Sequence, residues 1–343
     1  MENPDSVQIA TAGEALIDLI GRPDGLFDPC LGGAVYNLTR ALARQGVGTL
    51  YLNPLSSDRF GRALTQMLVD DGVHLAQPEP VSQVTSLAVV GLTAEGHPDY
   101  AFYREGVADR QVSAQGMTVA CAAHAGLQIV CTGALALDAR DADIYLPWLV
   151  AQHAQGRCVV VDANLRPSVM ADLPAYRRHV QQMLTLADVV KVSDEDLLHL
   201  DVPGPTVLHR ARHLLQTSGA QLLALTLGAE GAWLLTAEGE WHLRESRPLQ
   251  VLDTVGAGDS FLAGLLAALL ARQAQSGGPL LADLDGATCL QLLAHAVASA
   301  SLCVQQRGCV PPSWAQVRAW VDGGAASSQP AQAVASTPEA HAA

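Results

Sequence analysis

Short apolar runs that suit β-strands alternate with stretches of helical period along most of this chain. That alternation predicts an α/β fold, in which helices cover a mostly parallel sheet. The predicted strands are Val7–Ala12, Thr49–Asn53, Leu127–Thr132, Cys158–Asp162, Val189–Val192 and Leu222–Leu227. The predicted helices are Ala34–Gln45, Arg59–Asp71, Asp141–Gln155, Ala175–Ala187, Thr206–Ser218, Gly258–Gln273, Ala287–Gln305 and Trp314–Val321.

Three segments depart from this alternation. Ala15–Phe27 and Ser86–Arg104 combine strand-like residues with glycine breakers, and we expect strands and turns there that do not belong to the alternating pattern. Gly323–Ala343 is rich in Ala, Ser, Gln and Pro without periodicity, and we expect this tail to be disordered. The folded domain is therefore predicted to cover residues 1–322.

Composition narrows the class of protein. With 343 residues, 49% of them hydrophobic, the chain is long enough to bury a sizeable core. A formal charge of −14, with only 20 basic residues spread along the sequence, argues against a nucleic-acid partner. No uninterrupted apolar run reaches the roughly 20 residues of a membrane span, and the N-terminus lacks a secretory signal, so we expect a cytoplasmic protein with no membrane partner. The seven cysteines show neither metal-site nor disulfide-framework spacing.

The segment Asp253–Leu266 has a pattern that suits phosphoryl transfer. Gly256, Ala257 and Gly258 leave the backbone bare at the start of an apolar helix, whose first amides lack partners and favour an anion. Asp259 follows among those donors, where a carboxylate can accept the proton of an attacking hydroxyl. A glycine-rich helix start with an acidic cap has the same spacing, so the residues alone leave both interpretations open.

The same run resembles the C-terminal signature D-T-x-G-A-G-D of the ribokinase-like sugar kinases, also called the phosphofructokinase B family. A second block is similar to that family's N-terminal signature. It has paired glycines at Gly32 and Gly33, Asn37 four residues later, and the tetrapeptide D-R-F-G from Asp58. Two independent signatures in the right order are hard to obtain by chance, so the chain is identified as a member of this family.

The resemblance runs from about Gln8 to Val321. It implies a ribokinase-like three-layer fold with a mostly parallel central sheet flanked by helices. It also implies a small β-sheet lid over the sugar site, inserted at about residues 15–31 and 86–106. A lid of this kind excludes water from the phosphoryl donor. Because the exposed face of a β lid often pairs with another copy, the resemblance further implies a homodimer through the lid.

The acceptor sugar is expected beside the first strand. Asp18 follows that strand and so falls near the carboxyl ends of the parallel strands, where open α/β sheets bind ligands. The family uses an Asp at this motif position to hold the sugar, with Gly32, Gly33 and Asn37 contributing beside it. A charge on the surface of the lid is the alternative interpretation of Asp18.

Two further segments resemble the fructokinase-like subgroup. Phe102–Arg110 is similar to the lid segment over the substrate, which implies that Arg104 reaches a sugar hydroxyl or a carboxylate. A solvated lid arginine is the alternative. Asp162–Arg166 is similar to the motif D-x-N-x-R, which implies that Asn164 and Arg166 face the cleft between sugar and phosphate. A plain turn at the end of a strand is the alternative there.

The nucleotide site is implied by a third motif. Thr226, Gly228 and Gly231 match the family's nucleotide-binding turn T-x-G-x-x-G, in which glycines let the backbone approach phosphate and ribose. Taken alone, this pattern is weak. The glycines at positions 256 and 258 are expected to contact the nucleotide as well, through the bare amides described above.

The metal sites are where this chain departs from the family. Many members carry N-x-x-E, whose Glu organises the water network of magnesium, whereas this chain has Ser193 and Asp196 at those positions. The shorter Asp196 can still act through a water, and Glu195 is an alternative. The segment from 308 to 312 resembles the part that helps to enclose a monovalent cation near Asp253, which implies a potassium site.

Together these features predict an ATP-dependent sugar kinase that uses Mg²⁺ and, through Asp253, K⁺. Asp259 takes the proton of a primary hydroxyl, and the amides from Gly256 to Asp259 stabilise the γ-phosphoryl group. The motifs favour fructose as the sugar, with 2-keto-3-deoxygluconate or ribose as alternatives. A non-catalytic sensor of sugar or nucleotide is the alternative from a different class, kept open by the Ser193 and Asp196 replacements.

Overall fold

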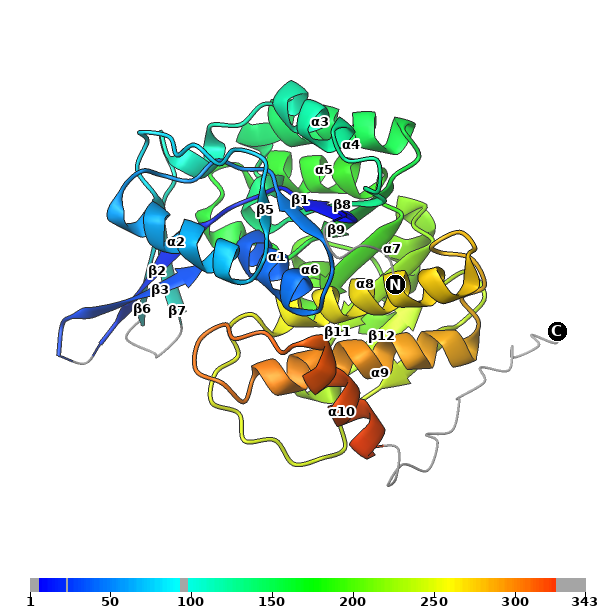
Figure 1. Cartoon of the computed structure of the whole chain (residues 1–343). Coiled ribbons are helices and arrows are strands. Elements are labelled where there is room, and N and C mark those ends of the chain that lie inside the picture. The colour runs from blue at the N-terminus through cyan, green and yellow to red at the C-terminus, as the bar shows by residue number, and fades with distance from the viewer. Residues whose placement is uncertain (1–5, 23, 93–97, 325–343) are drawn as a thin grey trace.

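A nine-stranded sheet forms the centre of the computed structural model, which describes residues 6–22, 24–92 and 98–324 (Figure 1). Its strands are β1 (Ile9–Thr11), β4 (Thr49–Tyr51), β5 (His74–Leu75), β8 (Ile129–Gly133), β9 (Cys158–Asp162), β10 (Val189–Ser193), β11 (Leu222–Thr226), β12 (Ala232–Leu235) and β13 (Glu240–Leu243). They lie in the order β13-β12-β11-β10-β9-β8-β1-β4-β5. The seven strands from β11 to β5 are parallel, and β12 and β13 extend one edge in antiparallel fashion.

Helices cover both faces of this sheet (Figure 1). They are α1 (Ala34–Arg44), α2 (Arg59–Asp70), α3 (Ala114–Ala122), α4 (Ala142–Ala154), α5 (Leu173–Leu184), α6 (Asp194–His199), α7 (Val207–Ser218), α8 (Ala257–Ser276), α9 (Gly286–Cys303) and α10 (Trp314–Gly324). Short 3-10 turns are η1 (Ala108–Arg110), η2 (Ala134–Leu137), η3 (Ala139–Asp141), η4 (Pro167–Val169) and η5 (Gly228–Glu230). Helices α3, α4, α5 and α7 pack on one face, and α1, α8 and α9 on the other.

Strand β9 shows why its sequence reads as a continuous apolar run. Val159 and Val161 point into the core under α4 and α5, whereas Val160 points into the core under α8. Side chains alternate across a strand, so a strand that is covered on both faces must be apolar at every position. The run ends at Asp162, at the carboxyl edge of the sheet, where polar residues begin.

A separate four-stranded sheet forms the lid. Its strands are β2 (Leu16–Gly21), β3 (Phe27–Gly32), β6 (Ser86–Leu92) and β7 (Pro98–Tyr103), in the order β3-β2-β6-β7. Figure 1 shows them projecting from one side of the molecule, next to α1 and α2. The expected second sheet is therefore confirmed. Along β2, Ile17 and Leu19 pack against the cluster that contains Tyr36 and Leu64, and the alternate residues face the opposite way.

Each predicted strand and helix has a counterpart whose ends agree to within about three residues. The list of predicted elements lacked the short helices α3 and α6 and the short strands β5, β12 and β13. Of the tail expected to be disordered, Gly323 and Gly324 instead belong to α10, and residues 325–343 lie outside the described residues.

No segment was expected to be long and apolar enough to cross a membrane, but helix α9 meets these two criteria. Its 18 residues pass that test by length and composition, with a mean hydropathy of 1.3. The physical reason is packing, because α9 lies between α8 and α10 and buries Leu292, Leu293 and Ala296 in the core. A helix that is buried on several sides is apolar around most of its circumference.

Candidate active site

A cavity of about 320 Å³ opens where the carboxyl ends of the parallel strands meet the start of α8. Residues from distant parts of the chain line it: Glu14, Asp18, Gly33, Asn37, Asn164, Arg166, Lys191 and the run from Thr254 to Asp259. The structure thus brings together segments that the sequence separates by more than half of its length. Open α/β sheets bind ligands at this edge.

The turn that precedes α8 leaves the helix amides free for a ligand. Gly256 is the N-cap residue, with a φ of 76°, and no side chain in the described part of the chain caps the helix. A Cβ on Gly256 would collide with Sγ of Cys309, so the turn requires glycine. The uncapped amides at Gly258 and Asp259, with the helix dipole behind them, form an anion-binding site.

Asp259 lies in the first turn of α8 and is almost completely buried, with 6% of its surface exposed. Its Oδ2 accepts a hydrogen bond of 3.1 Å from Nδ2 of Asn37 on α1. Burial, followed by the negative charge of Asp162, raises the pKa of Asp259 to about 7, although Lys191 and Asn37 oppose the shift. A carboxylate with this proton affinity suits a general base near neutral pH.

The paired glycines let the lid and α1 approach closely. A Cβ on Gly32 would collide with Oδ2 of Asp18, and a Cβ on Gly33, whose φ is 108°, would lie 2.6 Å from the backbone oxygen of Glu14. Asp18 therefore sits against bare backbone inside the cavity. Burial raises the pKa of Asp18 to about 6, against the opposing charge of Arg166.

Asn164 and Arg166 both line the cavity, as the motif implied. Asn164 adopts a left-handed backbone, with a φ of 37°, and its Oδ1 accepts a hydrogen bond of 2.8 Å from Nη1 of Arg166. The same nitrogen donates to the backbone oxygens of Asn164 and Leu165. The turn is thus a strand end held by side-chain hydrogen bonds, and the role of Asn164 and Arg166 toward sugar and phosphate stays a prediction.

Lys191 is a site residue that sequence reasoning missed. It lies in the middle of β10, is buried, and its Nζ contacts both carboxylate oxygens of Asp162, at 2.9 and 3.0 Å. The same Nζ lies 3.0 Å from the position that a Cβ on Gly258 would take. A lysine inside the apolar run V-V-K-V was the available signal, because lysine is almost never fully buried unless it is paired.

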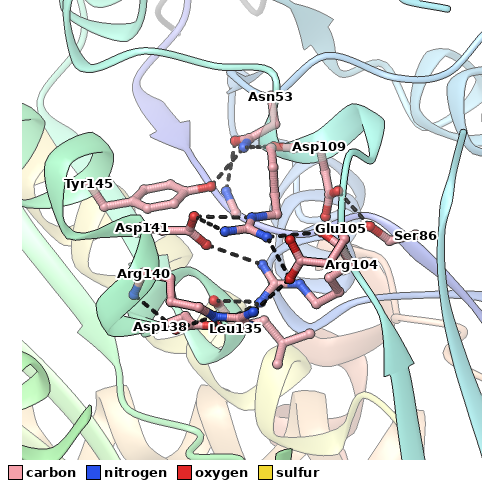
Figure 2. A network of polar contacts seen from close by, with 12 residues as sticks. Asn53, Ser86, Arg104, Glu105, Asp109, Leu135, Asp138, Arg140, Asp141 and Tyr145 are labelled. Carbon is pink, nitrogen blue, oxygen red and sulfur yellow. Dashed lines mark hydrogen bonds and ion pairs between the residues drawn. The ribbon is translucent and has the colours of Figure 1, made fainter. Parts of the chain in front are cut away.

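Arg104 does not line this cavity but belongs to a separate network of polar contacts (Figure 2). Its guanidinium is buried and faces Oδ2 of Asp138 at 3.7 Å and Oδ2 of Asp141 at 3.6 Å, and it donates to the backbone oxygen of Leu135. It lines an adjoining cavity of about 410 Å³ that shares Phe102 and Leu135 with the first. The expected direct contact with the sugar stays a prediction, and the alternative of a solvated lid arginine is wrong because the side chain is buried.

The candidate magnesium residue Asp196 accepts one backbone amide at each of its two oxygens. Its Oδ1 accepts the amide of Leu165 at 2.7 Å, and its Oδ2 accepts the amide of Ser193 at 2.8 Å. Ser193 in turn accepts the amide of Asp196, which completes a capping box at the start of α6. Within the described residues, no group of three His, Cys, Asp or Glu side chains could hold a metal ion. Each oxygen of Asp196 still has a lone pair that could accept a water, so the predicted role of Asp196 toward magnesium through a water stays a prediction.

Asp253 also accepts hydrogen bonds from the backbone. Its Oδ2 accepts the amide of Gly308 at 2.9 Å, and its Oδ1 accepts the amide of Val255 at 3.0 Å. These bonds tie the segment after α9 to the turn before α8. Each oxygen of Asp253 keeps a lone pair, so a cation near it stays a prediction.

The expected nucleotide residues lie at the end of the neighbouring strand. Thr226 ends β11, which pairs with β10, and Gly228 and Gly231 follow in the turn to β12. Gly231, with a φ of 87°, packs against the backbone of β13, and Gly228 has open space around its Cα. None of the three lines the 320 Å³ cavity, so they flank it on the side of β11.

Comparison with known proteins decides the family. The pfkB family carbohydrate kinase pattern matches residues 8–316. The chain belongs to the pfkB family of carbohydrate kinases. It is 33% identical over 265 residues to a fructokinase of Rhizobium leguminosarum bv. trifolii, a match that covers 76% of this chain and 79% of the relative. It is 31% identical to the aminoimidazole riboside kinase of Salmonella typhimurium, over 74% of this chain and 78% of that protein.

A solved structure agrees with this assignment. The fructokinase of Xylella fastidiosa with bound ATP matches with a TM-score of 0.81 and 27% identity, covering 94% of this chain and 99% of that one. The fold is therefore ribokinase-like, and the sequence resemblance to this family is confirmed. In this pfkB kinase the aspartate of the D-T-x-G-A-G-D signature, Asp259, is the residue that meets Asn37 of the other signature inside one cavity.

Proposed function

We propose that this pfkB kinase transfers the γ-phosphoryl group of ATP to the primary hydroxyl of fructose and forms fructose 6-phosphate. One observation carries the proposal: the buried carboxylate of Asp259, the carboxylate of Asp18 and the uncapped start of α8 line the same cavity. Asp259 and the helix amides supply a base and an anion site, as phosphoryl transfer requires. The fructokinase relatives favour fructose as the acceptor.

In the proposed reaction, Asp18, Gly33 and Asn37 hold the sugar so that its primary hydroxyl faces Asp259. Asp259 accepts the hydroxyl proton while the oxygen forms its bond to the γ-phosphorus. The bond from that phosphorus to the bridging oxygen breaks, and ADP leaves with the electron pair. The amides at the start of α8, together with Arg166 and Lys191, stabilise the charge on the transferring group. We assign Thr226, Gly228 and Gly231 to the nucleotide, since they flank this edge.

Phosphoryl transfer from ATP normally needs a divalent cation, and we propose Mg²⁺. The ion would be held mainly by the nucleotide phosphates and by waters, one of them accepted by Asp196, and it would neutralise charge on the phosphates. Potassium near Asp253 stays a proposal. Its test is the dependence of turnover on K⁺ at constant ionic strength, with Asp253→Asn as the variant that should lose that dependence.

We also propose that residues 1–322 act as one cytoplasmic kinase domain that dimerises through the lid. Several large apolar side chains on the lid strands or next to them are exposed: Ile20, Leu26, Phe27, Val84 and Tyr103. The strand register places Ile20 on the opposite face of the sheet from Phe27 and Tyr103, so the proposed interface would use the apolar side chains of one face. A monomeric mass in light scattering at the concentrations used for the assays would remove this part of the proposal.

The acceptor is tested by a coupled assay of ADP release with fructose, ribose, 2-keto-3-deoxygluconate and aminoimidazole riboside. We expect kcat/KM to be highest for fructose by at least ~10-fold, since a few polar contacts in a pocket discriminate to that degree. A faster reaction with another of these compounds would replace fructose as the substrate. Measurable ATP binding with no transfer to any sugar would favour the sensor instead.

A further inference from the structure

The ion pair between Asp162 and Lys191 lies immediately behind the anion site and the proposed base. The two residues are register partners on the adjacent strands β9 and β10, and both are buried. Lys191 reaches the wall of the cavity that Asp259 also lines, whereas Asp162 does not line it. Two charged residues are costly to bury in the middle of a sheet, so a pair at this position calls for an explanation beyond stability.

Lys191 stays positively charged in this setting. Burial alone would lower its pKa, but the carboxylates of Asp162 and Asp196 hold the pKa above its ordinary value. The two oxygens of Asp196 are occupied by backbone amides, so Asp162 is the partner that contacts Nζ. The remaining carboxylate that faces the ammonium group is that of Asp259. Asp259 directly follows Gly258, against which Nζ of Lys191 packs.

The groups around Asp259 come from several elements. Asn37 of α1 donates a hydrogen bond to it, Lys191 faces it from β10, and Asp162 and Arg166 face it from the end of β9 and the turn that follows. The thiols of Cys303 and Cys309 lie close behind the same turn. Among these groups, the members of the ion pair act on the Asp259 carboxylate in opposite directions, one as a cation and one as an anion.

We propose that the Asp162–Lys191 pair is a positioning element for the transfer reaction: Asp162 fixes the ammonium of Lys191 beside the start of α8, and the balance of their two charges sets the proton affinity of Asp259. The geometry supports this role, because Nζ is held by both oxygens of Asp162 and rests against Gly258. This inference rests on the proposed function, in which Asp259 accepts the proton of the sugar hydroxyl.

This role predicts opposite effects for the two halves of the pair. Asp162→Asn removes an anion and leaves the cation, so Asp259 should lose its proton at lower pH. Lys191→Met removes the cation, so Asp259 should hold its proton to higher pH. Residues that only stabilise the fold would lower activity without moving the titration of Asp259 in opposite directions. The direction of each shift is therefore the decisive readout.

The experiment measures kcat/KM for the sugar between pH 5 and 9 and fits the acidic limb. We expect the apparent pKa of that limb to fall by about one unit in Asp162→Asn and to rise by about one unit in Lys191→Met, as the loss of one nearby charge produces. The double variant should lie between the singles, and it removes both charges, which protects folding if Lys191→Met is unstable. Shifts of the same sign, or no shift, would overturn the proposal.

Asp71→Asn is the matched control. Asp71 is buried in an ion pair with Arg40 but does not line the cavity, so its variant should lose stability and leave the acidic limb in place. A direct titration of Asp259 by carbon NMR, assigned by its absence in Asp259→Asn, gives the same pKa without turnover. If no variant and no sugar gives turnover, the proposed function fails, and the NMR titration still decides the role of the pair.

Discussion

Two clusters of buried charge border the proposed acceptor site, and they shift the pKa of a carboxylate in opposite directions. In the cluster at the base of the lid, Arg110 and Arg140 reach Asp141 and Asp138 at 2.6 Å (Figure 2). Burial would raise the pKa of Asp138, but the hydrogen bonds from Arg140 hold it below its ordinary value. In the active-site cluster, Asp259 receives its hydrogen bond from a neutral amide, and burial raises its pKa.

The difference separates a structural use of buried charge from a chemical one. A carboxylate that contacts a cation directly stays ionised across the physiological range and holds two elements together. Asp259 has no cation in direct contact, because the ammonium of the nearby Lys191 is bound to Asp162. Such a carboxylate keeps a proton affinity high enough to accept a proton from a hydroxyl group. Mutations in the two clusters should therefore separate the loss of turnover from the loss of stability.

The largest effect is expected for Asp259→Asn. We expect kcat to fall by at least ~100-fold with little change in ATP affinity, because general-base contributions are of this size and the amide keeps the shape of the side chain. Steady-state turnover and a nucleotide-binding titration measure the two quantities. Near-normal turnover would show that Asp259 is not the general base. The contrast between a catalytic and a structural cluster of buried charge would then fail as well.

The same variant should not lose stability. The pKa of Asp259 is higher in the fold, at about 7, than its ordinary value of 3.8, so the folded state binds more protons between these values. The free energy of unfolding of the native enzyme therefore falls as pH rises through this window, and the penalty persists above it. Asn carries no such penalty, so the variant should be more stable than the native enzyme at pH 8, by about 1 kcal/mol or more. A less stable variant would contradict the assignment of a strained carboxylate.

The next effect concerns the lid cluster and is one of stability. Asp141 accepts hydrogen bonds from Nε and Nη2 of Arg110, at 3.0 and 2.6 Å, and is almost wholly buried. Asp141→Ala should lower the free energy of unfolding by ~3–5 kcal/mol, because it removes the buried carboxylate that pairs with Arg110 and faces Arg104. Chemical denaturation monitored by fluorescence measures the change.

The matched control for that prediction is an exposed pair. Arg318 and Asp322 lie 3.6 Å apart at i,i+4 on α10, and more than half of each side chain is exposed. Asp322→Ala should cost less than ~0.5 kcal/mol, since solvent screens the pair. Equal losses in the two variants would mean that the lid cluster does not stabilise the fold through its buried pairs.

The sequence was sufficient for the fold and for the segments that make the site. Each predicted strand of the main sheet has its counterpart, because a strand covered on both faces, such as β9, must be apolar at every position. The two signatures identified the family, and the structure brings Asn37 to Asp259 across 222 residues of sequence. Local pattern and motif spacing carry this information directly.

The sequence did not predict which groups the individual side chains contact. The carboxylate of Asp196 was assigned to magnesium by motif position, but whether backbone amides occupy it depends on how β9 ends beside α6. Arg104 was placed over the sugar by its lid motif, whereas its direction depends on Asp138 and Asp141, which lie more than 30 residues further along. Contacts of this kind are set by tertiary packing, which no local pattern reports.

The last prediction concerns Glu14, which lines the active-site cavity and is also close to Arg104 of the lid cluster. Its Oε1 accepts the amide of Ala34 at 2.9 Å, and burial raises its pKa to about 7 from 4.5, opposed by the charge of Arg104. Gln keeps the acceptor for Ala34 and removes the titration. Between pH 4.5 and 7 the native enzyme should therefore lose more stability with rising pH than Glu14→Gln does, by ~1–2 kcal/mol in total. Denaturation midpoints of both proteins at pH 5 and 8 measure this difference, and parallel pH profiles would show that the fold does not raise the pKa of Glu14.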